Sequence, residues 1–144
     1  IVDFGSGKRA LLDLSMFAQG SCYEQEVCAV GHRGKLECFI PGPKAIWGEQ
    51  TASPRVVVSP RRQVGPVETI VSIDQAALDA GSHTGATYYE HLAFQEAMRG
   101  EGEVEVTVED GLRAVVMGIA AQRSAATGQA VVITDEGFGV HDAG

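Results

Sequence analysis

The sequence predicts an α+β fold, a mainly antiparallel open sheet with helices packed on one face. Segments with a two-residue apolar alternation, separated by Gly- and Pro-rich turns, fill the first half of the chain and are typical of hairpins. Helical periodicity follows in the second half, and this order of strands and then helices is typical of α+β domains. We expect a single domain over residues 1–136 of the 144, followed by a flexible Gly-rich tail at 137–144.

The clearest element is a long helix that begins after Thr107. Thr107 and Asp110 have the spacing of a capping box, and Gly128 is a typical left-handed helix stop. Between these ends, apolar residues recur at helical spacing and form one stripe, which consists of Leu112, Val115, Val116, Ile119 and Ala120. We expect a shorter helix before it, a short strand between the two helices, and a closing strand that ends at Ile133.

Most of the first half of the chain is predicted to be extended. Alternating or β-branched runs predict strands at 1–4, 8–17, 25–30, 35–40, 55–59 and 67–73. The turn at 31–34 joins two of these strands as a hairpin, and residues 74–80 form a single helical turn. In the predicted strand at 8–17, Leu11 and Phe17 lie opposite Leu12 and Leu14, so both faces carry apolar groups. This pattern suggests a homo-oligomer, a dimer through the sheet face.

Composition and charge exclude several classes of partner. The net charge is −8, with 19 acidic and 11 basic residues, which argues against nucleic acid and anionic membrane surfaces. No apolar run approaches the roughly 20 residues that span a bilayer. Cys22, Cys28 and Cys38 match no zinc-ligand spacing, so we expect free, mostly buried thiols in a cytoplasmic protein without a metal site. His32, at a hairpin tip, has no metal partner in view.

A glycine motif near the start of the chain permits two interpretations. Gly5-Ser6-Gly7-Lys8-Arg9-Ala10 matches the G-x-G-x-x-A pattern that approaches a pyrophosphate in dinucleotide-binding folds. That pattern needs a helix directly after it, whereas the residues that follow alternate like a strand. We therefore favour a hairpin turn, and a helix from Lys8 to Phe17 would reverse that interpretation.

Three stretches of sequence are similar to one known family. They are VDFGSGKRALLDLSMF, VCAVGHRGKLEC and, most closely, GATYYEHLAFQEAMRGEGEVEVTVEDGLRAVVMGIAAQRSAATGQAVVI. The third stretch has an aromatic-started helix that ends in R-G, a short strand, and a helix that ends in S-A-x-T-G-x-x-V. With these patterns the chain resembles the C-terminal half of the Gfo/Idh/MocA oxidoreductases, the relatives of glucose–fructose oxidoreductase and inositol dehydrogenase.

The resemblance implies a division of labour in a longer parent protein. Family members use NAD or NADP to move a hydride to or from a sugar or polyol carbon. An N-terminal Rossmann domain holds the cofactor, and the C-terminal domain covers the substrate and builds dimers or tetramers. This chain has neither the family's Glu-Lys-Pro segment nor its Asp-x-x-x-His helix, so we expect no catalytic residue and no cofactor bound by the chain itself.

The sequence is therefore consistent with two functions. The first is the substrate-side and oligomerisation domain of an NAD(P)-dependent sugar or polyol oxidoreductase. The alternative is a non-catalytic stand-alone module, derived from that fold, that binds a small molecule or associates with itself. Under the first function, the resemblance places His83, Tyr88, Tyr89 and His91 at the edge of the substrate pocket, where they could hydrogen-bond sugar hydroxyls. Packing is the alternative role for each, and we favour it for His91.

Two further features keep alternatives open. Arg61 and Arg62 could hold an anionic ligand or could be solvated loop charges, and the second role is the commoner one for exposed arginines at turns. Trp47, the only tryptophan, is either an interface anchor or a cover for one edge of the core.

Overall fold

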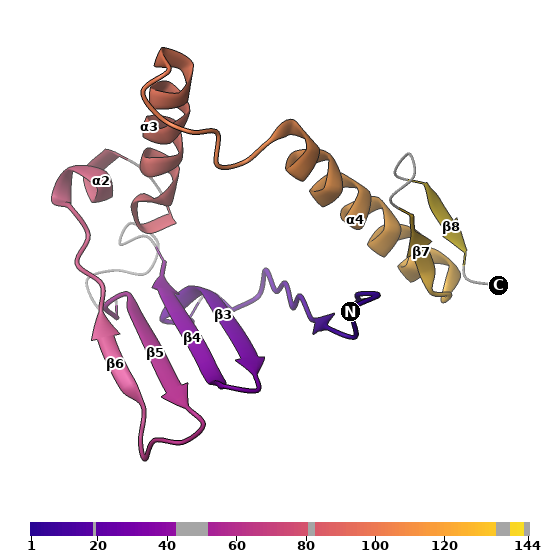
Figure 1. The fold of residues 1–144 in the computed structure, drawn as a ribbon, viewed down its shortest axis with the longest axis horizontal. Coiled ribbons are helices and arrows are strands. Elements are labelled where there is room, and N and C mark those ends of the chain that lie inside the picture. The colour runs from indigo at the N-terminus through magenta and orange to yellow at the C-terminus, as the bar shows by residue number, and fades with distance from the viewer. Residues whose placement is uncertain (19, 43–51, 81–82, 135–138, 143–144) are drawn as a thin grey trace. The chain divides into compact units, whose positions relative to one another are not determined.

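The computed structural model describes residues 1–18, 20–42, 52–80, 83–134 and 139–142. Its contacts divide the chain into two compact units, Ile1–His91 and Leu92–Gly144, and each unit is described by itself. The antiparallel sheets and the helices, drawn in Figure 1, confirm the α+β class. The single domain expected over residues 1–136 stays a prediction.

A short hairpin opens the first unit. Strands β1 (Val2–Asp3) and β2 (Arg9–Ala10) pair antiparallel. Gly7 closes the turn, since its φ is +79° and its N–H donates to the Phe4 carbonyl at 2.9 Å. The hairpin favoured from the sequence is therefore confirmed, and no helix follows it within residues 8–18.

The strand expected over residues 8–17 is wrong beyond Ala10. Residues 11–17 have no strand assignment, and their side chains are exposed. An extended segment becomes a strand only when a neighbour satisfies its backbone groups, and apolar alternation does not supply that neighbour. The argument for association, in which Leu11 and Phe17 lie on the opposite face of a strand from Leu12 and Leu14, therefore loses its structural basis.

A four-stranded antiparallel sheet forms the body of the first unit. Its strands are β3 (Tyr23–Gly31), β4 (Gly34–Pro41), β5 (Arg55–Pro60) and β6 (Val67–Ile70), and their order in the sheet follows the chain. The turn at 31–34 joins β3 and β4 as the sequence predicts, with Val30 opposite Lys35. The strand expected at 67–73 ends earlier, at Ile70. Residues 43–51, which include Trp47, lie outside the described residues.

The register gives this sheet two unlike faces, because residues directly opposite each other point to the same side. We name the first the apolar face, and it includes Val27, Ala29, Leu36, Cys38, Ile40, Val56, Val58 and Val67. The second, which we name the charged face, includes Lys35, Glu37, Phe39, Arg55 and Glu68. On the charged face, the Arg55 guanidinium lies 4.6 Å from the centre of the Phe39 ring and 3.3 Å from Glu68 Oε1.

Short helical elements complete the first unit and lead into the second. They are α2 (Gln75–Ala80), η1 (His83–Gly85) and α3 (Ala86–Arg99). The helical turn predicted at 74–80 is thus confirmed. Ala77 of α2 is fully buried, and a Cβ on Gly85 would come within 3.1 Å of the Ala77 Cβ. Gly85 also has a φ of +85°, so this close approach of η1 to α2 requires glycine.

The second unit is built on α4 (Val108–Thr127). Thr107 and Asp110 form the predicted capping box, and Gly128 ends the helix in the left-handed conformation with a φ of +71°. On the predicted apolar stripe, Val116 and Ala120 are buried. Strand β7 (Val131–Ile133) follows and pairs antiparallel with β8 (Val140–Asp142).

Two expectations for this unit differ from the structure. The short strand expected between the two long helices is wrong, because residues 100–107 contain no strand and the exposed Val104 and Val106 lie in no ladder. The structure also has a strand that the sequence did not predict, because β8 lies within the tail expected at 137–144. The Arg123 guanidinium donates to the Val140 carbonyl of this strand at 3.2 Å. The flexibility of the tail stays a prediction.

The sequence also predicts mostly buried thiols. In the first unit, however, Cys22 and Cys28 are exposed.

The Thr107–Asp110 capping box generates a prediction about helix stability and its pH dependence. Hydrogen bonds from the Thr107 hydroxyl (2.6 Å) and backbone N–H (3.0 Å) hold the pKa of the Asp110 carboxyl below its ordinary value of 3.8. We expect Thr107→Ala to lower the free energy of unfolding by about 1 kcal/mol at neutral pH, measured by urea denaturation followed by circular dichroism.

The sign of the pH effect follows from the lowered pKa. A carboxyl with a lowered folded-state pKa stabilises the fold above its unfolded value, and that stabilisation is lost as the pH falls through the folded value. The difference between wild type and Thr107→Ala should therefore shrink below about pH 4. Thr107→Ser, which keeps the hydroxyl, should behave like wild type. An equal loss in both variants would contradict the capping mechanism.

Candidate functional site

The substrate-pocket residues expected from the sequence lie where α2 gives way to α3. His83 and Thr84 both have left-handed backbone conformations, with φ of 58° and 57°. This region costs a residue with a Cβ on the order of 1–2 kcal/mol, and it is least accessible to a β-branched residue such as Thr84. Such a conformation persists only where surrounding interactions hold it.

Two side-chain interactions hold η1 against one end of the sheet. His83 Nδ1 lies 3.1 Å from Glu24 Oε1, near the start of β3. The Thr84 hydroxyl donates to the Pro41 carbonyl at 2.7 Å, at the end of β4. Both left-handed residues are therefore tied to neighbouring strands of the sheet, which explains how their backbone conformation is maintained.

The Glu24–His83 pair can hydrogen-bond a hydroxylated ligand. When Nδ1–H donates to the carboxylate, the imidazole ring is oriented and its Nε2 remains as an acceptor. The two side chains are 49% and 26% exposed, so a ligand in solution can reach both of them. The pair offers a carboxylate acceptor beside an imidazole at the edge of the sheet.

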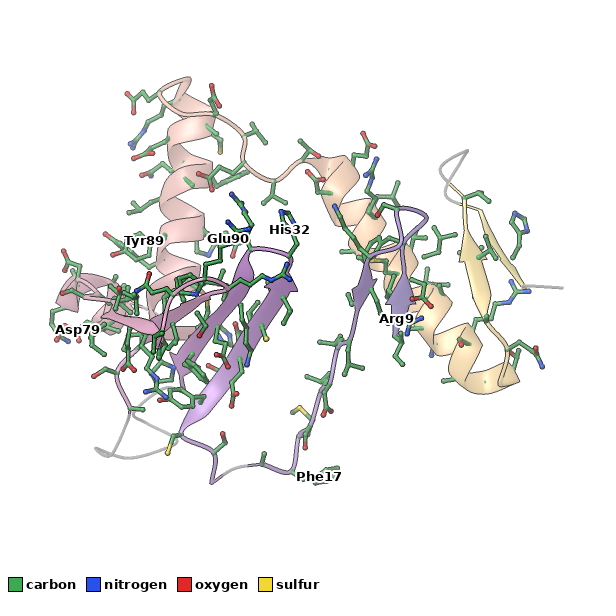
Figure 2. The ribbon with its side chains drawn as sticks, turned by 60° about the horizontal axis from the view of Figure 1, so that its bottom comes forward. Arg9, Phe17, His32, Asp79, Tyr89 and Glu90 are labelled. Atoms are coloured by element: carbon green, nitrogen blue, oxygen red, sulfur yellow. The ribbon has the colours of Figure 1, made fainter. Side chains whose placement is uncertain are left out.

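The two tyrosines lie one turn further along, on α3. Their rings meet edge to face, with centroids 5.7 Å apart and an interplanar angle of 73°. Tyr88 is half-buried and Tyr89 is exposed, as Figure 2 shows for Tyr89 near the start of the helix. His91 is also exposed, and among the described residues no hydrogen bond, ion pair or ring contact joins it to the other three. Substrate binding by these four residues stays a prediction.

Sequence reasoning missed two residues of this arrangement, Glu24 and Thr84. Glu24 lies 59 positions before His83, and only the folding of β3 beside η1 brings the two side chains together. No local motif signals such a pair. Thr84 has no sequence signal either, because its hydroxyl donates to a backbone carbonyl that lies 43 positions away.

The glycine motif at residues 5–10 does not have the structure of a nucleotide-binding loop. Dinucleotide binding at a G-x-G-x-x-A motif uses the N-terminus of the helix that follows. Here the motif forms the turn between β1 and β2, and residues 11–18 contain no helix. The nucleotide-binding interpretation is therefore not supported, and no step of the chemistry is assigned to a cofactor on this chain.

The part of the chain that the structure describes shows neither a metal-binding cluster nor a membrane-spanning helix. No group of three or more His, Cys, Asp or Glu side chains there is placed to hold a metal ion. None of the described helices combines the length and the apolar character needed to cross a bilayer.

Comparison with known proteins supplies the family. Residues 1–133 match the family described as "Oxidoreductase family, C-terminal alpha/beta domain", the C-terminal domain of the Gfo/Idh/MocA group. A search of curated proteins finds no significant match. The family match covers nearly all of the elements described above, from β1 to β7. The chain therefore belongs to the Gfo/Idh/MocA oxidoreductase family, as a C-terminal alpha/beta domain.

Proposed function

We propose that residues 1–133 act as the substrate-side and oligomerisation domain of an NAD(P)-dependent sugar or polyol oxidoreductase. The observation that carries this proposal is the family match over those residues. An oxidoreductase of this type moves a hydride between a nicotinamide and a carbon that bears a hydroxyl group. The part of that work assigned to this chain is to bind and orient the hydroxylated substrate.

The geometry around η1 supports a polyhydroxylated ligand. Each sugar hydroxyl is both a donor and an acceptor, so it is best bound by groups of both kinds. The Glu24 carboxylate accepts hydrogen bonds, and the phenol of Tyr88 can donate or accept one. The His83 imidazole accepts through Nε2 when its Nδ1–H donates to Glu24. Tyr89 and His91 lie on the same helix, α3, and are further candidates for hydrogen bonds to the ligand.

The cofactor is assigned to a part of the protein outside this chain. The only sequence motif suited to a pyrophosphate forms a hairpin, so the chain offers no helix N-terminus behind it. The proposal therefore gives the chain no NAD or NADP of its own and no catalytic residue.

The apolar face of the sheet supports self-association. Val27, Leu36, Val58 and Val67 retain between 39% and 56% of their exposure there. Covering such a face stabilises a protein by about 25 cal/mol for each Å² of apolar surface removed from water. We assign this face to a second copy of the chain, because a self-complementary surface closes into a two-fold dimer.

The first prediction tests the assignment of the cofactor. Calorimetric titration of the purified chain with NADH and with NADPH should show no binding with a Kd below about 1 mM, because the G-x-G-x-x-A motif lies in a hairpin and residues 11–18 contain no helix. The same titration of the full-length parent protein should show binding and serves as the positive control. Binding by the chain alone with a Kd well below about 1 mM would contradict this part of the proposal.

The second prediction tests the substrate-side role in the full-length parent. Tyr88→Phe removes the phenol hydroxyl, and Glu24→Gln removes the carboxylate charge that faces His83. We expect each to raise KM for the polyol about tenfold with a smaller change in kcat. Tyr23→Phe makes the same chemical change on the charged face of the sheet and should leave the kinetics unchanged. Unchanged kinetics in the first two variants would favour the non-catalytic module instead.

The third prediction tests the dimer. Val58 and Val57 are neighbours on β5 that point to the apolar and the charged face, respectively. We expect Val58→Lys to weaken the dimer at least tenfold in sedimentation equilibrium, because it buries a charge in the interface. Val57→Lys places the same charge between Glu37 and Glu68 and should leave association intact. A wild-type chain that stays monomeric at high concentration would remove the proposal.

A further inference from the structure

We propose that the two turns at the far end of the four-stranded sheet form a binding site for a phosphate-bearing small molecule. The turn after β3 and the turn after β5 border a shallow depression of about 390 Å³. It is lined by His32, Arg33, Pro60, Arg61 and Arg62. Figure 2 shows His32 at the turn end of the β3–β4 hairpin. This proposal does not rest on the function proposed above.

The fold fixes these two turns side by side. Gly34 pairs with Pro60 at the end of the β4–β5 ladder, and the Arg61 N–H then donates to the Arg33 carbonyl at 2.9 Å. Gly34 lies so close to the Ser59 carbonyl that a Cβ would overlap it, and its φ is +152°. Arg33 and Arg61, which are 28 positions apart in the sequence, are therefore held together by the backbone. A preorganised site loses less entropy when it binds a ligand.

The charge of this end of the sheet differs from that of the chain as a whole. The chain has a net charge of −8, yet residues 29–36 and 57–67 contain no Asp or Glu. They contain four cationic residues, Arg33, Lys35, Arg61 and Arg62. Lys35 is paired with Glu37 at 2.7 Å. The three arginines make no ion pair with any residue that the structure describes.

Uncompensated arginines on adjoining turns repel one another, and an anion between them removes that repulsion. The chain is acidic, yet none of the carboxylates that the structure describes forms an ion pair with these three arginines. The three arginines of this depression are instead left for a ligand. The sequence left both an anion site and solvated loop charges open for Arg61 and Arg62, and it does not place Arg33 beside them.

The chemistry of the depression favours a phosphate group. The planar guanidinium presents two parallel N–H donors that match two oxygens of a phosphate, and several arginines together neutralise its two charges. A ring nitrogen of His32 adds one further donor. The volume of about 390 Å³ is at the small end for ligand sites, which fits a single phosphorylated metabolite.

This site is separate from the one at η1. Strand β3 runs from Tyr23 to Gly31, so Glu24 lies near its start and His32 just beyond its end. At the usual rise of a strand, the two lie about 25 Å apart along β3. One small ligand does not reach both, so the phosphate-bearing molecule is a second ligand rather than part of the polyol.

The proposal is tested by titrating the ¹⁵N-labelled chain with inorganic phosphate at constant ionic strength. We expect saturable shifts of the amides of His32–Gly34 and Arg61–Gln63, with a Kd of about 1 mM. Arg33→Gln with Arg61→Gln should raise that Kd at least tenfold. Arg61→Lys, which keeps the charge but loses the two-pronged donor, should give an intermediate Kd.

The matched control is Lys8→Gln with Arg99→Gln, which removes the same charge from other elements and should leave the Kd unchanged. An equal weakening in this control would show general charge attraction and overturn the proposal. Equal shifts with chloride would do the same. Tighter binding of anionic lipid vesicles or of an oligonucleotide than of α-glycerophosphate would overturn the assignment to a small molecule. An unchanged urea midpoint for the glutamine variant excludes unfolding as the cause of a raised Kd.

Discussion

Backbone hydrogen bonding on both edges of β4 is the interaction on which both candidate sites depend. This strand pairs with β3 on one side and with β5 on the other. At the C-terminal end of β4, the Pro41 carbonyl accepts a hydrogen bond from the Thr84 hydroxyl and so positions η1. At the N-terminal end of β4, the contact between Gly34 and Ser59 aligns two turns and brings their arginines together. Loss of either ladder would therefore separate residues that the two proposed sites require to be close.

Few of the described side chains are buried within either unit. Only three hydrophobic residues among those described are buried, namely Ala77, Val116 and Ala120. The apolar face of the sheet and the stripe of α4 each remain partly exposed within their own units. Because apolar burial is the main favourable term in folding, these surfaces hold most of the stabilisation that further contacts would supply. The proposed dimer would cover the first of them.

The sequence predicted those elements whose signals are local. The capping box at Thr107, the stop at Gly128 and the turn at 31–34 each involve residues within a few positions of one another, and all three are confirmed. The strands expected at 8–17 and before Thr107 failed because alternation describes one strand and not its partner. The Glu24–His83 pair and the Arg33–Arg61 contact could not be predicted, since both depend on the register of a sheet and have no motif of their own.

His83 and Thr84 of η1 both have left-handed backbone conformations, although neither residue is glycine. Glycine adopts the left-handed region without cost, and the chain uses it for that purpose at Gly7, Gly85 and Gly128. At positions 83 and 84 the chain instead has a histidine and the β-branched residue threonine, and the left-handed conformation raises the backbone energy at both. The Thr84 hydroxyl anchors the turn to Pro41, which offsets part of that cost. The exposed His83 ring has Glu24 to orient it, which leaves the other ring nitrogen for the ligand that we propose at this surface.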